Sequence, residues 1–170
     1  MNVLRNIVIC SCIMLFGSCC GQTKEKAFLT QYEFEDFSQF KSASIYVRGA
    51  DSEKNPIILV DAPYLIRDTS RVGCYRVILG KKNNQVINAH WTLLRSGCVD
   101  ADTIKLQKLA QSFRQYKIPR LDVDEKGNVF VFLKDVETLA LVRFANEEEL
   151  QKRSKEMEWI NIKHNWYKPR

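Results

Sequence analysis

CYRVILGKKNNQVINAHWTLL, residues 74–94, contains two apolar-rich runs that flank a polar segment, the clearest structural pattern in this sequence. Such runs around a short polar loop are typical of a β-hairpin. A two-residue turn at Asn83 and Asn84 would set Val77 opposite His90. A three-residue loop, residues 83–85, instead gathers apolar residues on one face by opposing Tyr75 with Leu93, Val77 with Trp91, and Leu79 with Ala89. Register follows the pairing that buries one whole apolar face, so we predict the three-residue loop.

Further strands are predicted on both sides of this hairpin. The ranges with strand-like patterns are 45–48, 56–60, 121–123, 129–133, 139–144 and 159–167. The run at 56–60 is mostly apolar, which predicts a strand covered on both faces. The loop at 125–127 contains Gly127 where a hairpin needs a positive φ.

Two helices are predicted between these strands. Asp102 can cap a helix over residues 102–116, and Pro119 prevents its continuation. This helix has one apolar stripe, made of Leu106, Leu109, Ala110 and Phe113. The second helix begins after Asn146, and residues 28–40 have the composition of a further short helix. We therefore predict a single α+β domain, residues 28–170, in which an antiparallel sheet built from hairpins packs against two helices.

The amino terminus has the three zones of a secretory signal peptide. Arg5 supplies a positive charge, residues 7–16 form an uncharged run of ten, and Gly17 and Ser18 follow. A membrane-spanning helix needs roughly 20 apolar residues, so this run predicts a signal rather than a permanent span. Removal of residues 1–18 would leave Cys19 first, whereas cleavage one residue later would leave Cys20.

The ending LFGSC, residues 15–19, resembles the lipobox of bacterial lipoproteins, with Phe16 where leucine is usual. This resemblance implies a diacylglycerol on the thiol of Cys19 and a position in the cell envelope, facing the periplasm. Residues 19–27 are polar after the two cysteines and are predicted to form a tether. The first partner expected is therefore a membrane, reached through the lipid anchor.

The net charge bears on which partners the protein can bind, and the cysteines bear on whether it contains a disulfide. The chain has 26 basic and 20 acidic residues, a net charge of +6, which is compatible with three anionic partners: an acidic protein, an anionic membrane or the carboxylates of peptidoglycan. It has no dense basic stripe or nucleic-acid motif, so we expect no nucleic acid partner. Outside the cytoplasm a Cys74–Cys98 disulfide is chemically permitted. The predicted register places Cys74 opposite Leu94, so this bond would require the chain to double back, and both states remain open.

Few residues in this sequence are candidates for catalysis or metal binding. His90 could act as a base for the thiol of Cys74 or Cys98. No third residue that would orient the histidine stands at a spacing typical of a catalytic triad, so we expect His90 to be structural. A zinc site from these three residues lacks a close ligand pair. The segment from Asp122 to Gly127 echoes a calcium loop, but Lys126 stands where a ligand belongs. We therefore expect no metal and no cofactor, and a catalytic role is the weaker interpretation.

Three hypotheses of function follow. The first is a tethered module that binds a protein, as do the immunity lipoproteins with which bacteria neutralise antibacterial toxins. The second is a small thiol or histidine hydrolase, or a cell-wall enzyme, that would use His90. The third is a structural component of the envelope. We favour the first, because binding requires complementarity and no catalytic residues.

Overall fold

The computed structural model describes residues 23–61, 74–79, 89–93 and 103–170. The described residues divide into two compact units, and the boundary in the chain falls between Glu33 and Phe34. In the first unit, helix α1 spans Lys24–Tyr32 and begins inside the segment predicted as a tether. The hydroxyl of Thr23 caps it by accepting a hydrogen bond from the backbone N–H of Lys26 at 3.3 Å.

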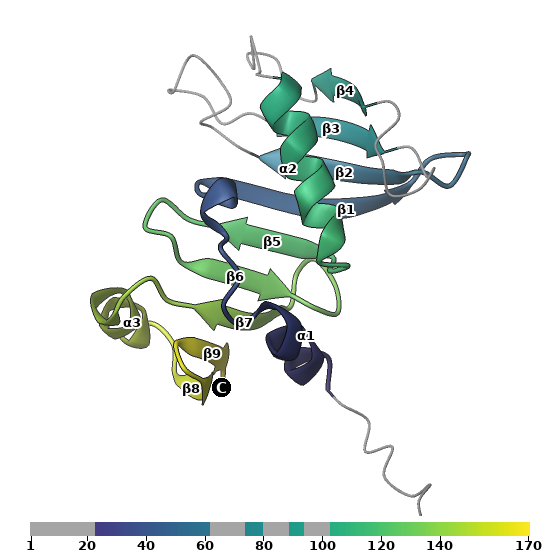
Figure 1. Cartoon of the computed structure of the whole chain (residues 1–170). Coiled ribbons are helices and arrows are strands. Elements are labelled where there is room, and N and C mark those ends of the chain that lie inside the picture. Colours follow the sequence, from purple (N-terminus) through teal and green to yellow (C-terminus); the bar gives the residue numbers. More distant parts are fainter. Residues whose placement is uncertain (1–22, 62–73, 80–88, 94–102) are drawn as a thin grey trace, which may run out of the picture. The chain divides into compact units, whose positions relative to one another are not determined.

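The second unit is dominated by one antiparallel sheet. Its nine strands, counted over the described residues, follow the order β4-β3-β2-β1-β5-β6-β7-β9-β8 (Figure 1). They are β1 (Ala43–Ala50), β2 (Pro56–Asp61), β3 (Cys74–Leu79), β4 (Ala89–Leu93), β5 (Arg120–Val123), β6 (Val129–Phe132), β7 (Leu139–Arg143), β8 (Trp159–Lys163) and β9 (Trp166–Pro169). The helices of this unit are η1 (Ser38–Phe40), α2 (Thr103–Gln115) and α3 (Glu147–Ser154). The predicted α+β class with a hairpin-built sheet is confirmed.

The register predicted for residues 74–94 is confirmed. Strands β3 and β4 pair antiparallel with Tyr75 opposite Leu93, Val77 opposite Trp91, and Leu79 opposite Ala89. The same face continues into β2, because Val60 pairs with Tyr75 and Ile58 pairs with Val77. The whole face of the hairpin therefore follows from the alternation of its side chains.

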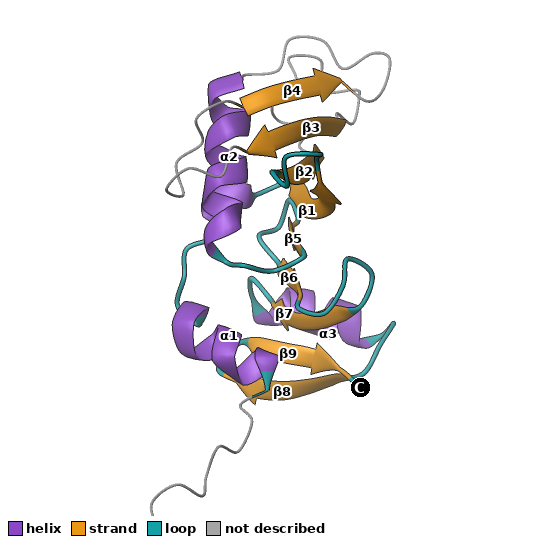
Figure 2. Cartoon of the chain, turned by 90° about the vertical axis from the view of Figure 1, so that its right-hand side faces the viewer, coloured by secondary structure: helices purple, strands orange, loops and turns teal. Residues whose placement is uncertain are grey.

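Helix α2 covers this apolar face over β2 and β3, as Figures 1 and 2 show from two sides. The predicted stripe is buried in full, with Leu106, Leu109, Ala110 and Phe113 all turned away from solvent. Each fully buried large side chain contributes about 1.5–3 kcal/mol, so this stripe fixes α2 on the sheet. Strand β2 is covered on both faces, as predicted, because Ile58, Leu59 and Val60 are all buried.

Two predictions of local structure were wrong. Residues 159–167 were predicted as one strand, but they contain the hairpin of β8 and β9 with a turn at His164 and Asn165. His164 has φ 49°, a left-handed conformation that ends β8. Residues 28–40 do not form one helix, because Glu35, Asp36 and Phe37 separate α1 from η1 without helical structure. Alternating apolar residues in WINIKHNWY continue across the turn, which is why the pattern concealed it.

An arginine lies on the core face at the other end of the sheet. The guanidinium of Arg143 stacks on the rings of Phe37 and Trp166, at 5.0 and 5.4 Å from their centroids. Its Nη1 donates to the backbone carbonyl of Glu35 at 2.8 Å, and burial lowers the pKa of this guanidinium. The segment that leads to η1 crosses the sheet in front of β6 and β5 (Figure 1). Arg143 thus fastens that segment to the core.

Candidate functional site

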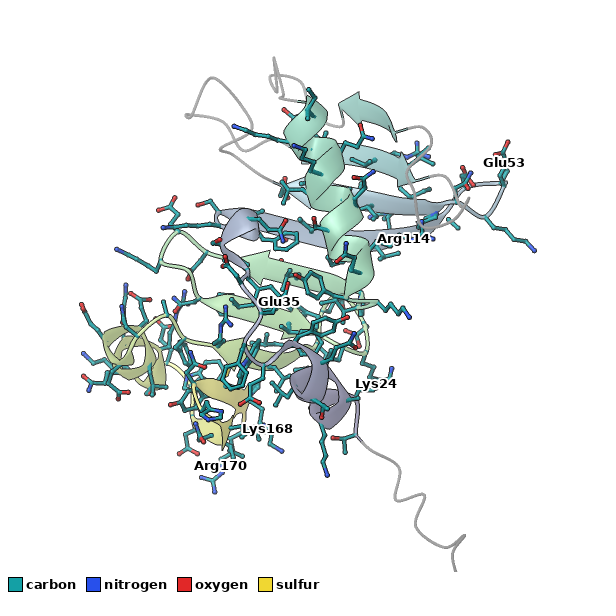
Figure 3. All side chains as sticks on the ribbon, in the orientation of Figure 1. Lys24, Glu35, Glu53, Arg114, Lys168 and Arg170 are labelled. Carbon is teal, nitrogen blue, oxygen red and sulfur yellow. The ribbon has the colours of Figure 1, made fainter. Side chains whose placement is uncertain are left out.

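The second unit contains an open cleft of about 1140 Å³ at the carboxyl end of α2. It lies between that helix end, the turn that follows, and the ends of β1 and β2. Its lining residues are Val47, Arg48, Gly49, Pro56, Ile58, Gln111, Phe113, Arg114, Gln115, Lys117, Ile118 and Pro119. Figure 3 shows Arg114 beside the carboxyl-terminal part of α2. We call this hollow the basic cleft.

The local sequence explains why the chain turns at this point. Helix α2 ends at Gln115, and the N–H of Lys117 then donates to the carbonyl of Arg114 at 3.3 Å. Lys117 has φ 53°, the left-handed conformation in which helices often end and which glycine adopts at least cost. The carbonyl of Pro119 accepts from the N–H of Val47 at 2.8 Å, which joins the turn to β1. This join brings Lys117 to the same cleft as Arg48.

The floor of the basic cleft is apolar and its rim is cationic. Phe113, Ile58 and Ile118 are buried, whereas Arg48 and Lys117 are exposed. None of the lining residues is acidic. Within the described residues, no carboxylate forms an ion pair with Arg48 or Lys117. A ligand that combines carboxylates with an apolar group would complement both parts of this surface.

A second hollow, of about 450 Å³, lies around Ser44 and Asp122 and is lined by acidic residues. Two of its carboxylates, those of Asp122 and Asp124, are bound to the protein itself. Asp122 pairs with Arg120 at 2.6 Å and accepts from the hydroxyl of Ser44 at 2.6 Å. Asp124 accepts from the backbone N–H groups of Lys126 and Asn128. These contacts stabilise the strands and the β5–β6 turn, which leaves the basic cleft as the better candidate.

The turn from Asp124 to Gly127 is a hairpin turn, as predicted. The N–H of Gly127 donates to the carbonyl of Asp124, and Gly127 has φ 90°. The carboxylate of Asp124 is occupied by N–H groups of its own loop, an arrangement common at Asp-initiated turns. Among the residues that the structure describes, no group of three or more His, Cys, Asp or Glu residues is arranged to hold a metal ion.

The residues singled out from sequence for chemistry are only partly described. Cys74 begins β3, and His90 lies in β4 opposite Ile78. Ile78 lies four positions after Cys74, so the backbones of Cys74 and His90 are roughly 13 Å apart along the strands. Cys19 and Cys98 lie outside the described residues, and so does any Cys74–Cys98 bond. Sequence reasoning missed Arg48, Arg114 and Lys117, although the net positive charge pointed to cationic surface of this kind.

Comparison with known proteins adds no relative. No protein-family model matches this sequence, and neither a curated protein nor a solved structure resembles it at a significant level. Among the described helices, none is long and apolar enough to cross a membrane. The features that bear on function are therefore the basic cleft and the residues at the amino terminus.

Proposed function

We propose that this protein is a lipid-anchored module of the bacterial cell envelope, and that its basic cleft binds an acidic segment of another protein. The observation that carries the proposal is the combination in one open cleft of an apolar floor with three cationic side chains and no acidic one. The anchor rests on the lipobox-like ending at Cys19. An immunity role, in which the partner is an antibacterial toxin, is one form of this proposal.

Charge and apolar area would contribute differently to binding. An exposed ion pair contributes only about 0.2–1 kcal/mol, so the three cations alone would give weak attachment. Phe113 is 1% and Ile118 7% exposed, so the apolar contribution would come mainly from the area that the partner's own side chain buries in the cleft, at about 25 cal/mol per Å². The cations would accelerate association and select an acidic partner, and salt would weaken that effect. We therefore expect an affinity that falls as ionic strength rises.

The backbone at Lys117 supports the same interpretation. A left-handed conformation is disfavoured for lysine by about 1 kcal/mol relative to glycine, which has no Cβ. Glycine would adopt the positive φ at this helix end at least as easily as lysine. A lysine at this position is explained if its ammonium group contacts the partner.

Site-specific crosslinking in living cells tests the proposal. A photoreactive amino acid replaces Gln115 in the full-length chain, and the same residue in place of Ile104, exposed near the start of α2, is the control. We expect a protein adduct from position 115 and none from 104, with the crosslinked peptide of the partner rich in Asp or Glu. The charge reversals Arg48→Glu and Lys117→Glu should abolish the adduct, and Lys168→Glu on β9 should not.

Rescue decides whether charge complementarity is responsible. Replacing the acidic residues of the crosslinked segment with lysine should restore the adduct with the Arg48→Glu and Lys117→Glu variants. Lys117→Gly should weaken the adduct while leaving the melting temperature unchanged or raised. An adduct insensitive to charge reversal, or no adduct at position 115, would rule out the basic cleft as the binding site.

A further inference from the structure

Exposed apolar side chains gather at one end of the sheet. Among the described residues, five large apolar side chains are exposed, and four of them are Phe34, Met157, Ile160 and Ile162. The last three lie on β8 or just before it, and β8 is the final strand of the sheet (Figures 1 and 2). The ring of Phe34 lies against that of His164, in the turn after β8, with 5.4 Å between the ring centroids. We call the four exposed residues the apolar edge.

Phe34 is held in its exposed position by the residue that follows it. Its side chain is 81% exposed, although phenylalanine is among the residues most often buried. The carbonyl of Glu35 accepts from Arg143, and the carboxylate of Glu35 accepts from the hydroxyl of Tyr116 at 3.0 Å. Exposed apolar residues scattered singly need no explanation, whereas a group of them indicates a contact surface. The apolar edge is such a group.

The segment that contains most of the apolar edge is cationic. Residues 151–170 include six lysines and arginines and two glutamates, so their side chains have a net charge of +4. Both glutamates form ion pairs with arginines of the same segment, at 2.8 and 3.9 Å. Lys168 pairs with Ile160 across the β8–β9 ladder, so a cationic and an apolar side chain share one face of the hairpin. Figure 3 shows Lys168 and Arg170 on this hairpin. Apolar and cationic side chains together are complementary to an anionic bilayer surface.

The proposed lipid anchor would bring this surface to a bilayer. Fourteen residues separate Cys19 from Phe34, and nine of them form α1. Helix α1 spans about 12 Å, and the rest of this link, even if fully extended, would add roughly 25 Å. An acylated Cys19 would therefore keep Phe34 within roughly 40 Å of the membrane surface. Phe34 is the first residue of the second unit, so no other residue of that unit is closer to the anchor along the chain.

We propose that the apolar edge rests on the anionic surface of the membrane to which Cys19 is anchored. This inference rests on the lipid anchor of the proposed function and adds a second membrane contact to it. The apolar side chains enter the headgroup region, and the cations of residues 151–170 lie among anionic headgroups. Strands β9, β7, β6 and β5 separate β8 from β1, about 24 Å along the sheet. The contact therefore leaves Arg48 and the basic cleft away from the bilayer, where a protein partner can reach them.

Photocrosslinking to lipid tests the contact on the full-length, acylated chain. The protein is reconstituted into vesicles of phosphatidylethanolamine and phosphatidylglycerol, with a photoreactive phenylalanine analogue in place of Phe34. The same analogue in place of Ile104, which is 66% exposed on α2, is the control. We expect lipid adducts at position 34 and few at position 104, identified by mass spectrometry of the crosslinked peptides.

Charge reversal tests the cationic part of the contact. A lysine close to an anionic leaflet raises binding about fivefold, so Lys168→Glu should lower the yield of lipid adducts at position 34 about fivefold. Lys54→Glu makes the same change of charge on an exposed lysine in the β1–β2 turn, and it should leave the yield unchanged. In vesicles of phosphatidylcholine alone, the wild type and both variants should give the same low yield. The protein adduct at position 115 should survive Lys168→Glu, because the basic cleft is a separate surface.

The outcomes separate this inference from the proposed function. A chain whose intact mass shows no diacylglycerol would overturn the lipid anchor and the membrane contact together. An acylated chain with equal lipid adducts at positions 34 and 104, or with equal effects of Lys168→Glu and Lys54→Glu, would overturn the membrane contact alone. An adduct from position 34 to a second copy of the chain, in place of lipid, would also overturn it.

Discussion

Asn128 joins three segments of the second unit through one buried carboxamide. The residue has no exposed surface. Its Nδ2 donates to Oδ2 of Asp124 at 2.8 Å and to Oε2 of Glu149 at 2.9 Å, and its Oδ1 accepts from the N–H of Ala145 at 2.9 Å. These bonds connect the β5–β6 turn, the chain after β7, and α3. We predict that Asn128→Ala is among the most destabilising single changes in this protein.

The magnitude follows from what the substitution leaves behind. Alanine would remove three hydrogen bonds and leave the N–H of Ala145 and one oxygen of Glu149 without their partner, and Glu149 is only 9% exposed. A buried polar group left unsatisfied costs about 1–3 kcal/mol, and more if it is charged. The expected loss in free energy of unfolding is therefore about 3–5 kcal/mol. For a chain of this length, that corresponds to a fall of about 10 °C in melting temperature.

Urea denaturation followed by circular dichroism measures this loss. Asn165→Ala is the control, because it removes the same group from an exposed turn residue whose Nδ2 lies 3.4 Å from the carbonyl of Phe144. The control should lose less than about 1 kcal/mol. If Asn128→Ala loses no more than Asn165→Ala, the network of Asn128 does not stabilise the fold and the reasoning fails.

Two further predictions concern the turns that flank β6. Gly127→Ala should lower the free energy of unfolding by about 1–2 kcal/mol in a denaturation experiment, because Gly127 has φ 90° and alanine is strained there. A steric clash is not the cause, since the nearest side-chain atom, Cβ of Ala145, is 3.9 Å from the added methyl. An unchanged free energy of unfolding would contradict this prediction. Hydrogen bonds from the N–H groups of Thr138 and Glu137 lower the pKa of Asp135 from its ordinary value of 3.8. The ionised carboxylate therefore stabilises the fold at pH values above 3.8, and this stabilisation is lost as the pH falls through the lower pKa of the folded state. Asp135→Asn should therefore reduce the fall of stability with acid below pH 3.8, and a stability–pH curve parallel to that of the wild type would count against it.

Local chemistry made several elements predictable from sequence. The second helix was expected to begin after Asn146, and the side chain of Asn146 caps it by accepting from the N–H of Glu149 at 3.0 Å. Gly127 was expected at a positive φ and has one. Capping and turn formation involve residues three or four positions apart, so the sequence contains both partners in each case.

Side chains with long-range partners were not predictable in this way. Arg153 illustrates the difference, because the i, i+4 spacing suggests an ion pair with Glu149. In the structure Arg153 lies 3.8 Å from the carboxylate of Asp124, and Glu149 accepts from Asn128 instead. The alternation of β7 likewise places Arg143 on the core face, but it does not predict that its guanidinium stacks on aromatic rings and donates to the carbonyl of Glu35. A helical or alternating pattern predicts on which face of its element a residue lies, but it does not predict which residue it contacts on that face.

The class of fold, the register of residues 74–94 and the buried stripe of α2 could all be predicted from sequence, because alternation, turn chemistry and helical period act over a few neighbouring residues. Three arrangements became known from the folded chain alone: β1 lies between β2 and β5, Arg48 and Lys117 line one cleft, and β8 forms an edge of the sheet. These arrangements depend on pairings such as the bond from Val47 to Pro119, whose partners are distant in the chain. Such contacts form only when the closure of long loops is compensated by burial of the whole core, so no local stretch of sequence encodes them.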